Sequence, residues 1–489
     1  MTSVFAATTL DIANVPTDLF VAGGWRPGSG GARIDVRDPS TGNVIANVAD
    51  ATVEDAAACI NAAYAASLGF SSMPARQRGE ILRKCFDLMV HYKEQLAQLI
   101  SLENGKALTD AQAEVAYAAE FFRWFSEEAV RISGDLGVAP SGANRMLVHY
   151  QPIGVSVLVT PWNFPAAMAT RKIAPALAAG CTCILKPATE TPLTAYALAA
   201  LFKEAGVPDG VINVLTTSRS GAVVDAMLQD PRVRKLSFTG STEVGRVLLR
   251  SAAARIVNCS MELGGNAPFI VFDDADLDLA IEGAMIAKMR NGGEACTAAN
   301  RFYVQRAVYE TFAMRLAERM KSVKVGAGNR ADTGCGPLIN ANAVSKVSEL
   351  VDDAIAKGAR LLAGGKHLEG EGYFYLPTVL TDVPRDAKLL NEEIFGPVAP
   401  IVAFDDEDEV IEMANATEYG LVAYVYTGDM KRGLRVSEAI ESGMIALNRG
   451  LVSDPAAPFG GVKQSGLGRE GAHHGVLEFM EAKYIATAW

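Results

Sequence analysis

Between residues 153 and 262, apolar runs of strand length alternate with stretches of helical pattern. The apolar runs read IGVSVLVT, CTCILK, GVINVL and VRKLSFTG, and the helical stretches cover 166–179, 192–206, 220–228 and 242–255. Such alternation predicts a parallel, doubly wound sheet. Ligands of these sheets bind beyond the carboxyl ends of the strands. The segments TPWNFP, LKPATETP, FTGSTEVG and MELGGN stand at or near such ends, so we expect the functional site there.

The rest of the chain extends this α/β pattern in both directions. The first 50 residues carry the Gly and Pro punctuation of short strands and turns, and three helical runs follow, the second over 75–105. Residues 146–154 alternate like a hairpin strand, and a second alternating region runs from about 265 to 450. The C-terminal segment EFMEAKYIATAW is interpreted as an edge strand.

Composition narrows the class of protein. The chain has 489 residues and a net charge of −11, which argues against nucleic acid or an anionic membrane as the main partner. Seven dispersed cysteines do not form a disulfide framework and suit a reducing compartment. The N-terminal segment lacks a basic region, and the most apolar windows are short and end in charge. We therefore expect a cytoplasmic protein with neither a signal peptide nor a membrane span.

The segment RNGGEACTAANR contains Cys296 among small and polar residues. An arbitrary cysteine is most often a small buried hydrophobic residue. A glycine-rich loop instead lets a backbone N–H approach a reacting atom, as an oxyanion requires. A Cys/His pair of the cysteine-protease type is disfavoured, because the five histidines, such as His149, are poorly placed for it. Cys296 is thus a candidate nucleophile.

Further candidates stand at the ends of the apolar runs, and each allows a structural and a functional interpretation. Glu262 could be a capping carboxylate or a general base, and Asn163 a turn former or an oxyanion donor. Gly240 and Ser241 open a helix whose N–H groups could bind a pyrophosphate. Lys186 could contact a ribose or a phosphate, or it could be solvated.

Taken together, TPWNFP, LKPA, FTGSTEVG, MELGGNAP, the Cys296 loop, EEIFGPV and PFGGVKQSGLGRE resemble, in order and spacing, the aldehyde dehydrogenase superfamily. ELGGNAPFIVFDDADLD and GVKQSGLGREG look most like its succinate-semialdehyde dehydrogenase branch. The resemblance implies a Rossmann-like NAD(P)-binding domain over 1–132 and 153–261 and an α/β catalytic domain over 262–469. It also implies a bridging β-hairpin element over 133–152 and 470–489, a homodimer or homotetramer, and no metal.

Carried over position by position, the resemblance assigns roles to individual residues. Cys296 resembles the nucleophile and Glu262 the base that activates the deacylating water. Asn163 with the Cys296 N–H resembles the oxyanion hole, and Lys172 and Glu470 match positions that tune the site. The positions that match cofactor contacts are Trp162, Lys186, Gly240, Ser241, Leu263, Glu393 and Phe395.

The resemblance also addresses substrate and cofactor. Arg290, Arg171 and Ser453 match residues that clamp a distal carboxylate in the succinate-semialdehyde branch, and guanidinium offers the bidentate fork that a carboxylate uses. Glutarate semialdehyde or another carboxylated aldehyde is the alternative substrate, since one methylene changes discrimination by only about 1–3 kcal/mol. Thr189 replaces a glutamate that repels a 2′-phosphate, and Arg219 could add a positive contact. We therefore expect NADP⁺, with NAD⁺ second.

Two positions depart from the family pattern. Glu294 stands where the family usually has glutamine, and a carboxylate near a thiolate would raise the thiol pKa, so we expect it to point away or be neutralised. Ala298 stands where some relatives carry a second cysteine, so a disulfide switch in this loop is absent. A non-catalytic structural protein on the same fold is the competing class, and the joint presence of Cys296, Glu262 and Asn163 argues against it.

Overall fold

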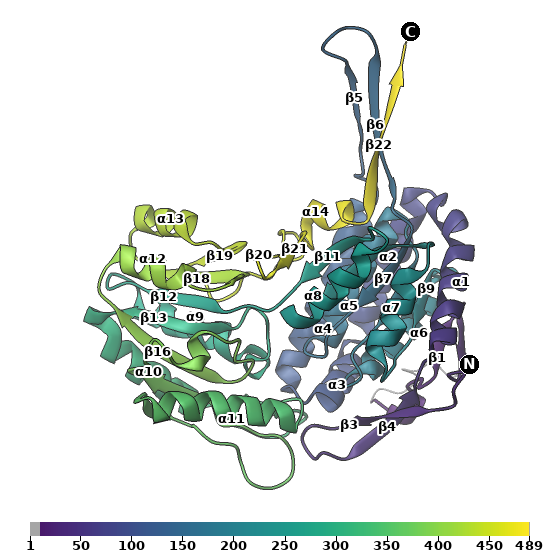
Figure 1. Ribbon diagram of the computed structural model, residues 1–489. Coiled ribbons are helices and arrows are strands. Elements are labelled where there is room, and N and C mark those ends of the chain that lie inside the picture. The colour runs from purple at the N-terminus through teal and green to yellow at the C-terminus, as the bar shows by residue number, and fades with distance from the viewer. Residues whose placement is uncertain (1–9, 489) are drawn as a thin grey trace.

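The structure is a computed structural model and describes residues 10–488. Two large β-sheets, each accompanied by helices, form the body of the molecule, and a three-stranded sheet projects from it (Figure 1). The expected α/β architecture is confirmed.

The first large sheet has eight strands in the order β2-β1-β9-β8-β7-β10-β11-β21. The five adjacent strands from β9 to β11 in this order are parallel to one another, and β1 and β21 pair antiparallel with the two outer strands of this group. The doubly wound sheet expected from the alternating runs is therefore present. Its strands are β1 (Leu19–Val21), β2 (Gly24–Arg26), β7 (Val155–Val159), β8 (Cys183–Lys186), β9 (Ile212–Val214), β10 (Val233–Thr239), β11 (Asn258–Glu262) and β21 (Gly466–Leu467).

Four helices follow strands of this sheet within two residues of the expected bounds. They are α5 (Pro165–Ala179), α6 (Pro192–Ala205), α7 (Ser220–Gln229) and α8 (Thr242–Ala253). Proline opens α5 and α6, because a first-turn residue has no intrahelical partner for its N–H. Gly180 and Gly206 end them at φ 95° and 89°, a left-handed conformation that glycine adopts without steric cost.

The N-terminal helices correct one expectation. They are α1 (Val53–Ser71), α2 (Ala75–His91), α3 (Lys93–Asn104) and α4 (Leu108–Glu128). The run expected as one helix over 75–105 is therefore two, separated at Tyr92 with φ −99° and ψ 22°. The break lets α2 and α3 each pack against α4 while both keep their apolar side chains buried. A hairpin of β3 (Arg33–Arg37) and β4 (Val44–Ala49) precedes α1.

The second large sheet contains seven strands in the order β14-β15-β16-β13-β12-β18-β19, all parallel except the β14–β15 pair. The strands are β12 (Ala267–Val271), β13 (Ala299–Gln305), β14 (Arg360–Ala363), β15 (Thr378–Thr381), β16 (Val398–Phe404), β18 (Val422–Tyr426) and β19 (Met444–Leu447). The helices are α9 (Leu277–Met289), α10 (Tyr309–Lys321), α11 (Ala341–Ala356), α12 (Glu407–Asn415) and α13 (Met430–Ala439). The second alternating region is thus a second α/β layer.

The projecting sheet is antiparallel, in the order β22-β6-β5. It joins β5 (Asp135–Val138) and β6 (Arg145–Pro152) to β22 (Met480–Thr487), which follows the short helix α14 (Ala472–Leu477). The C-terminal segment is therefore an edge strand, as expected (Figure 1). No helix within residues 10–488 has the length and apolar character needed to span a membrane.

Candidate active site

A cavity of about 280 Å³ opens at the carboxyl ends of β7, β10 and β11. Asn163 lies in the loop after β7, Gly240 directly after β10, and Leu263 directly after β11, and all three line the cavity. Cys296, Glu393 and Ser453 reach the same cavity from loops connected to the second sheet. The structure therefore brings the separate motifs together at the strand ends where the alternating pattern indicated a site.

Cys296 lies on a loop between η2 (Arg290–Gly293) and β13, and its residue is partly exposed at the cavity. The loop is held at Thr297, the residue that follows the thiol. The Tyr424 hydroxyl donates to the Thr297 carbonyl at 2.7 Å, and Arg290 donates to the Thr297 hydroxyl at 3.2 Å. Burial raises the pKa of the Cys296 thiol to about 12, and the positive charge of Arg171 opposes that rise.

Two glycines are required by close approaches around this loop. Gly293 has φ 80°, and a Cβ there would lie 2.2 Å from the Gly396 carbonyl oxygen. At Gly265, a Cβ would lie 2.5 Å from the carbonyl oxygen of Cys296 itself. A side chain at either position would displace the backbone next to the thiol, because real Cβ contacts are longer than this.

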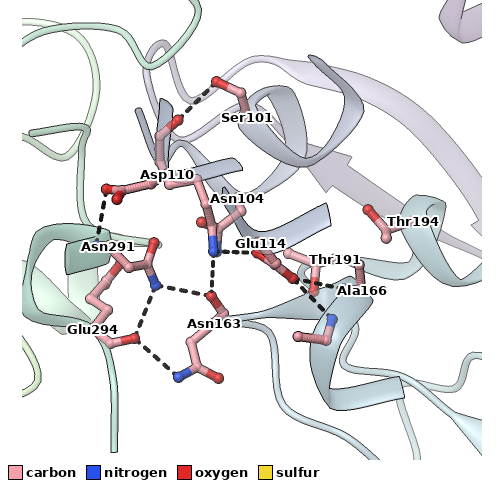
Figure 2. Close-up of polar contacts among 12 residues, drawn as sticks. Ser101, Asn104, Asp110, Glu114, Asn163, Ala166, Thr191, Thr194, Asn291 and Glu294 are labelled. Carbon is pink, nitrogen blue, oxygen red and sulfur yellow. Dashed lines mark hydrogen bonds and ion pairs between the residues drawn. The ribbon is translucent and has the colours of Figure 1, made fainter. Parts of the chain in front are cut away.

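Asn163 is anchored through both its backbone and its side chain (Figure 2). Its carbonyl oxygen accepts hydrogen bonds from Lys106 Nζ at 2.7 Å and from Asn291 Nδ2 at 2.9 Å. Its own Nδ2 donates to the Glu294 carbonyl at 3.0 Å. The buried Asn163 Oδ1 finds no hydrogen-bond partner in the described part of the chain. The carboxamide thus stands at the cavity wall beside Cys296 with one Nδ2 hydrogen unassigned.

A buried carboxylate pair lies behind the wall. Glu470 pairs with Lys172 at 2.5 Å and with Arg171, and although burial opposes its ionisation, these two cations lower its pKa. Burial and the Glu470 charge raise the pKa of Glu262 well above its usual value. The two carboxyl groups are therefore driven to opposite protonation states. Glu262 and Lys172 do not themselves line the cavity, so the structure brings them near the wall and not onto it.

Arg171, Arg290 and Ser453 all line the cavity. The Arg171 guanidinium is buried, 4.0 Å from the Phe459 ring centroid, and its Nη2 has no hydrogen-bond partner within residues 10–488. The pKa of Tyr117, another lining residue, is raised by burial and lowered by Arg171, Arg290 and a hydrogen bond with Ser453. The phenol therefore lies at the point where the three expected carboxylate-binding residues converge.

The expected cofactor-binding residues divide into two groups. Those that line the cavity are Trp162, Gly240, Ser241, Leu263, Glu393 and Phe395. Ser241 caps α8 by accepting from the Val244 N–H at 3.4 Å, so the positive end of that helix faces the cavity. Glu393 accepts from the Gly265 N–H at 3.1 Å, and burial raises the pKa of its carboxyl group to about 7.

Lys186 and Thr189 form the second group, outside the cavity. Lys186 Nζ donates to the Ser220 hydroxyl at 3.1 Å, next to the exposed Arg219, and burial lowers its pKa to about 8. The Thr189 hydroxyl donates to the Glu190 carboxylate at 3.1 Å. Thr189 and Glu190 line a separate cavity of about 180 Å³.

Glu294 points away from Cys296, as expected. Its carboxyl group accepts from the Ile339 N–H at 3.1 Å, and Glu294 does not line the cavity. Burial raises its pKa to about 8, so the group is mostly neutral at pH 7. The carboxyl group thus occupies the position of the usual glutamine largely without a charge.

Comparison with known proteins identifies the family. The model of the aldehyde dehydrogenase family matches residues 25–485. The chain belongs to this family. It is 53% identical to a succinate-semialdehyde dehydrogenase of Paenarthrobacter nicotinovorans, over 91% of this chain and 99% of that one. A glutarate-semialdehyde dehydrogenase of Pseudomonas putida is 50% identical, over 96% and 97% respectively.

Structural comparison agrees with the family assignment. A crystal structure described as an E. coli NADP-dependent enzyme superposes on this aldehyde dehydrogenase with a TM-score of 0.96. The two chains are 48% identical, and the match covers 98% of this chain and 99% of the other. The fold, including the first sheet and its crossover helices, is thus shared over nearly the full length.

Four residues of the aldehyde dehydrogenase site were not among the candidates taken from the sequence. Tyr117 is one aromatic residue in a helix, and Lys106 and Glu114 are isolated polar residues outside every quoted motif, whereas Asn291 lies in the Cys296 segment itself. Lys106 Nζ donates to the Glu114 carboxylate at 2.6 Å. Glu114 also accepts from the Ala166 N–H at 2.9 Å, at the start of α5 (Figure 2). The one sequence signal among the four is the Asn-Gly-Gly run at 291–293, which is typical of a turn.

Proposed function

We propose that this aldehyde dehydrogenase oxidises succinate semialdehyde to succinate with NADP⁺, using Cys296 as nucleophile. The observation that carries the proposal is one cavity that holds the thiol together with Arg171 and Arg290. Two guanidinium groups inside a small cavity suit a substrate with a carboxylate at the end opposite its aldehyde.

In the proposed first step, Cys296 Sγ attacks the aldehyde carbon and the carbonyl oxygen becomes an oxyanion. The Asn163 carboxamide and the Cys296 N–H donate to that oxygen. Because both donors are held in place before the reaction, they stabilise the charge without reorganising. Arg171 favours the thiolate form, since it opposes the burial that raises the thiol pKa.

A thioester remains on Cys296 once a hydride has left the substrate carbon, and in the proposed second step water cleaves this thioester. Glu262 accepts a proton from that water. Its raised pKa makes it a stronger base than an exposed carboxylate once it is ionised, and Lys172 and Glu470 adjoin it for proton exchange. Because Glu262 lies behind the cavity wall, its side chain rotates toward the thioester for this step.

Substrate recognition is proposed to rest on four groups. Arg171 Nη2 and the Arg290 guanidinium bind the distal carboxylate, and Ser453 and Tyr117 donate hydroxyl hydrogen bonds to it. The unpartnered state of the buried Arg171 Nη2 supports this role, since a buried donor without a partner costs about 1–3 kcal/mol until a ligand satisfies it. Glutarate semialdehyde is the second candidate, supported by the Pseudomonas putida relative.

The residues around the cavity fit a nicotinamide dinucleotide. Gly240, the N–H groups at the N-terminus of α8, Glu393 and Phe395 would hold the coenzyme, and the positive end of α8 would suit its pyrophosphate. The coenzyme, when bound, accepts the hydride that leaves the substrate carbon. Lys186, Ser220 and Arg219 supply a positive and hydroxyl-rich setting for a 2′-phosphate, which supports NADP⁺ over NAD⁺.

The same proposal covers assembly, location and domain limits. The projecting sheet exposes Leu136, Val138, Tyr484 and Ile485, which supports a homodimer or homotetramer in which a second copy covers it. Seven free cysteines support a cytoplasmic location. We assign coenzyme binding to 1–132 with 153–261, catalysis to 262–469, and subunit bridging to 133–152 with 470–489.

The test is oxidation of succinate semialdehyde by the purified protein, followed by NADPH formation and by identification of succinate. Wild type is expected to form one succinate per NADPH, and Cys296→Ala is expected to form neither. A wild-type protein that forms no NADPH with this aldehyde would overturn the proposal.

A further inference from the structure

Asn291 is a buried residue to which the proposed reaction assigns no task. It lies in the loop between α9 and Cys296, in a left-handed conformation with φ 53° and ψ 39°. Asparagine tolerates this conformation better than most residues with a side chain. The Asn291 N–H donates to Asp110 Oδ2 of α4 at 3.0 Å. The backbone of Asn291 is thus held in an uncommon conformation, which fixes the direction of its carboxamide.

That carboxamide joins two segments of the site (Figure 2). Asn291 Nδ2 donates to the carbonyl oxygen of Asn163 at 2.9 Å and to that of Glu294 at 3.0 Å. Asn163 belongs to the loop after β7, whereas Glu294 precedes Cys296 by two residues. Asn163 Nδ2 donates to the same Glu294 oxygen at 3.0 Å. The loop after β7, which carries Asn163, and the nucleophile loop, which carries Glu294 and Cys296, therefore meet around the Glu294 carbonyl group.

This arrangement determines how the Asn163 carboxamide is turned. The Glu294 carbonyl can only accept, so Asn163 presents Nδ2 and not Oδ1 to it. The remaining Nδ2 hydrogen is then available at the cavity. Lys106 Nζ holds the Asn163 carbonyl from the α3–α4 side and would still hold it without Asn291. The connection that depends on Asn291 is the one between Asn163 and the nucleophile loop.

We propose that Asn291 is a positioning residue whose carboxamide sets the placement of the Asn163 donor relative to Cys296 Sγ. The inference rests on the proposed function, because it needs Asn163 to act on an oxyanion formed at Cys296. A misplacement of about 1 Å in such a site costs roughly 10²-fold in rate. We therefore expect loss of the Asn291 carboxamide to slow oxyanion-forming chemistry roughly 10- to 100-fold.

The test compares two reactions of the same thiol in Asn291→Gly, which keeps the left-handed backbone and removes the carboxamide. With p-nitrophenyl acetate, the thiolate attacks the ester carbonyl, passes through an oxyanion and releases p-nitrophenolate. With iodoacetamide, the thiolate displaces iodide and forms no oxyanion. The rate of the p-nitrophenolate burst is expected to fall roughly 10- to 100-fold, while alkylation stays within about threefold of wild type.

Asn448→Gly is the matched control. Asn448 is also left-handed, at φ 52°, and its Nδ2 donates to the Thr427 carbonyl at 2.9 Å. Because it does not connect the two loops, its replacement is expected to leave both rates of Cys296 within about threefold of wild type. Equal losses in the two variants would show a general effect of removing a turn carboxamide and would overturn the proposal.

A double variant tests whether Asn291 acts through Asn163. If it does, Asn163→Ala combined with Asn291→Gly acylates no more slowly than Asn163→Ala alone. Multiplied losses, or a parallel fall in alkylation and acylation, would overturn the inference. Failure of the proposed function has a different result, since wild type would then not oxidise succinate semialdehyde at all.

Discussion

Replacing Arg290 by alanine removes one of the two guanidinium groups at the cavity. Arg290 donates to the Thr297 hydroxyl at 3.2 Å, and its guanidinium carbon lies 5.3 Å from the Phe164 ring centroid. Neither contact consumes its full set of five donors, so a fork remains for a carboxylate. A hydrogen bond to a charged group contributes about 1.5–3 kcal/mol. At 1.4 kcal/mol per tenfold, KM for succinate semialdehyde should rise roughly 10- to 150-fold.

The turnover number should change much less than KM. The distal carboxylate is bound equally in the ground state and the transition state, and loss of such uniform binding raises KM with kcat nearly unchanged. Butanal has the same four carbons without the carboxylate, so it is the matched substrate. We expect kcat/KM for butanal to stay within about threefold of wild type in Arg290→Ala.

The assay is steady-state NADPH formation with both aldehydes in wild type, Arg290→Ala and Arg290→Lys. Lysine keeps the charge but lacks the bidentate fork, so Arg290→Lys should lie between the other two. Equal losses of kcat/KM for succinate semialdehyde and butanal would refute the carboxylate role, because they would show damage to the Thr297 contact beside Cys296.

Three further predictions concern Tyr117, Thr189 and Glu294. Tyr117→Phe removes the hydroxyl that meets Ser453, so KM for succinate semialdehyde should rise about tenfold while butanal is unaffected, as steady-state kinetics would show. Thr189→Glu places a second carboxylate beside Glu190, so the ratio of kcat/KM with NADP⁺ to that with NAD⁺ should fall below one; an unchanged ratio would contradict the assignment of this position. Burial raises the pKa of Glu294 to about 8 in the folded protein, above its value in the unfolded chain. The folded state therefore favours the neutral carboxyl group, so the free energy of unfolding is highest below about pH 4.5 and falls as the pH rises toward 8. Glu294→Gln should therefore raise the thermal midpoint at pH 8 more than at pH 5, and a gain that does not depend on pH would be inconsistent with that burial.

The first sheet was predictable because its strands are buried on both faces. Strands such as β7 and β8 are apolar without alternation, and their helices begin at proline and end at glycine. The division at Tyr92 was not predictable, since the apolar period continues across it and only packing against α4 requires the bend. Local patterns therefore locate elements but not a change in their direction.

The site was predictable where its chemistry lies in motifs at strand ends. Asn163 and Gly240 stand in motifs that follow strands, Cys296 stands in a glycine-rich loop before β13, and all three line the cavity. The anchors of Asn163 were not predictable, because Lys106 and Asn291 reach it across 57 and 128 residues of sequence. The position of Glu262 behind the wall was also hidden, since it depends on side-chain orientation rather than on the motif.

The measurement that tests the central claim most directly is kcat/KM for succinate semialdehyde, glutarate semialdehyde and butanal, each with NADP⁺ and with NAD⁺. The account predicts the highest value for succinate semialdehyde with NADP⁺. It predicts a lower kcat/KM for glutarate semialdehyde, by a factor that corresponds to about 1–3 kcal/mol of transition-state binding, and a kcat/KM for butanal far below both. A value for butanal equal to or above those of the two semialdehydes would contradict the claim that this cavity recognises a distal carboxylate.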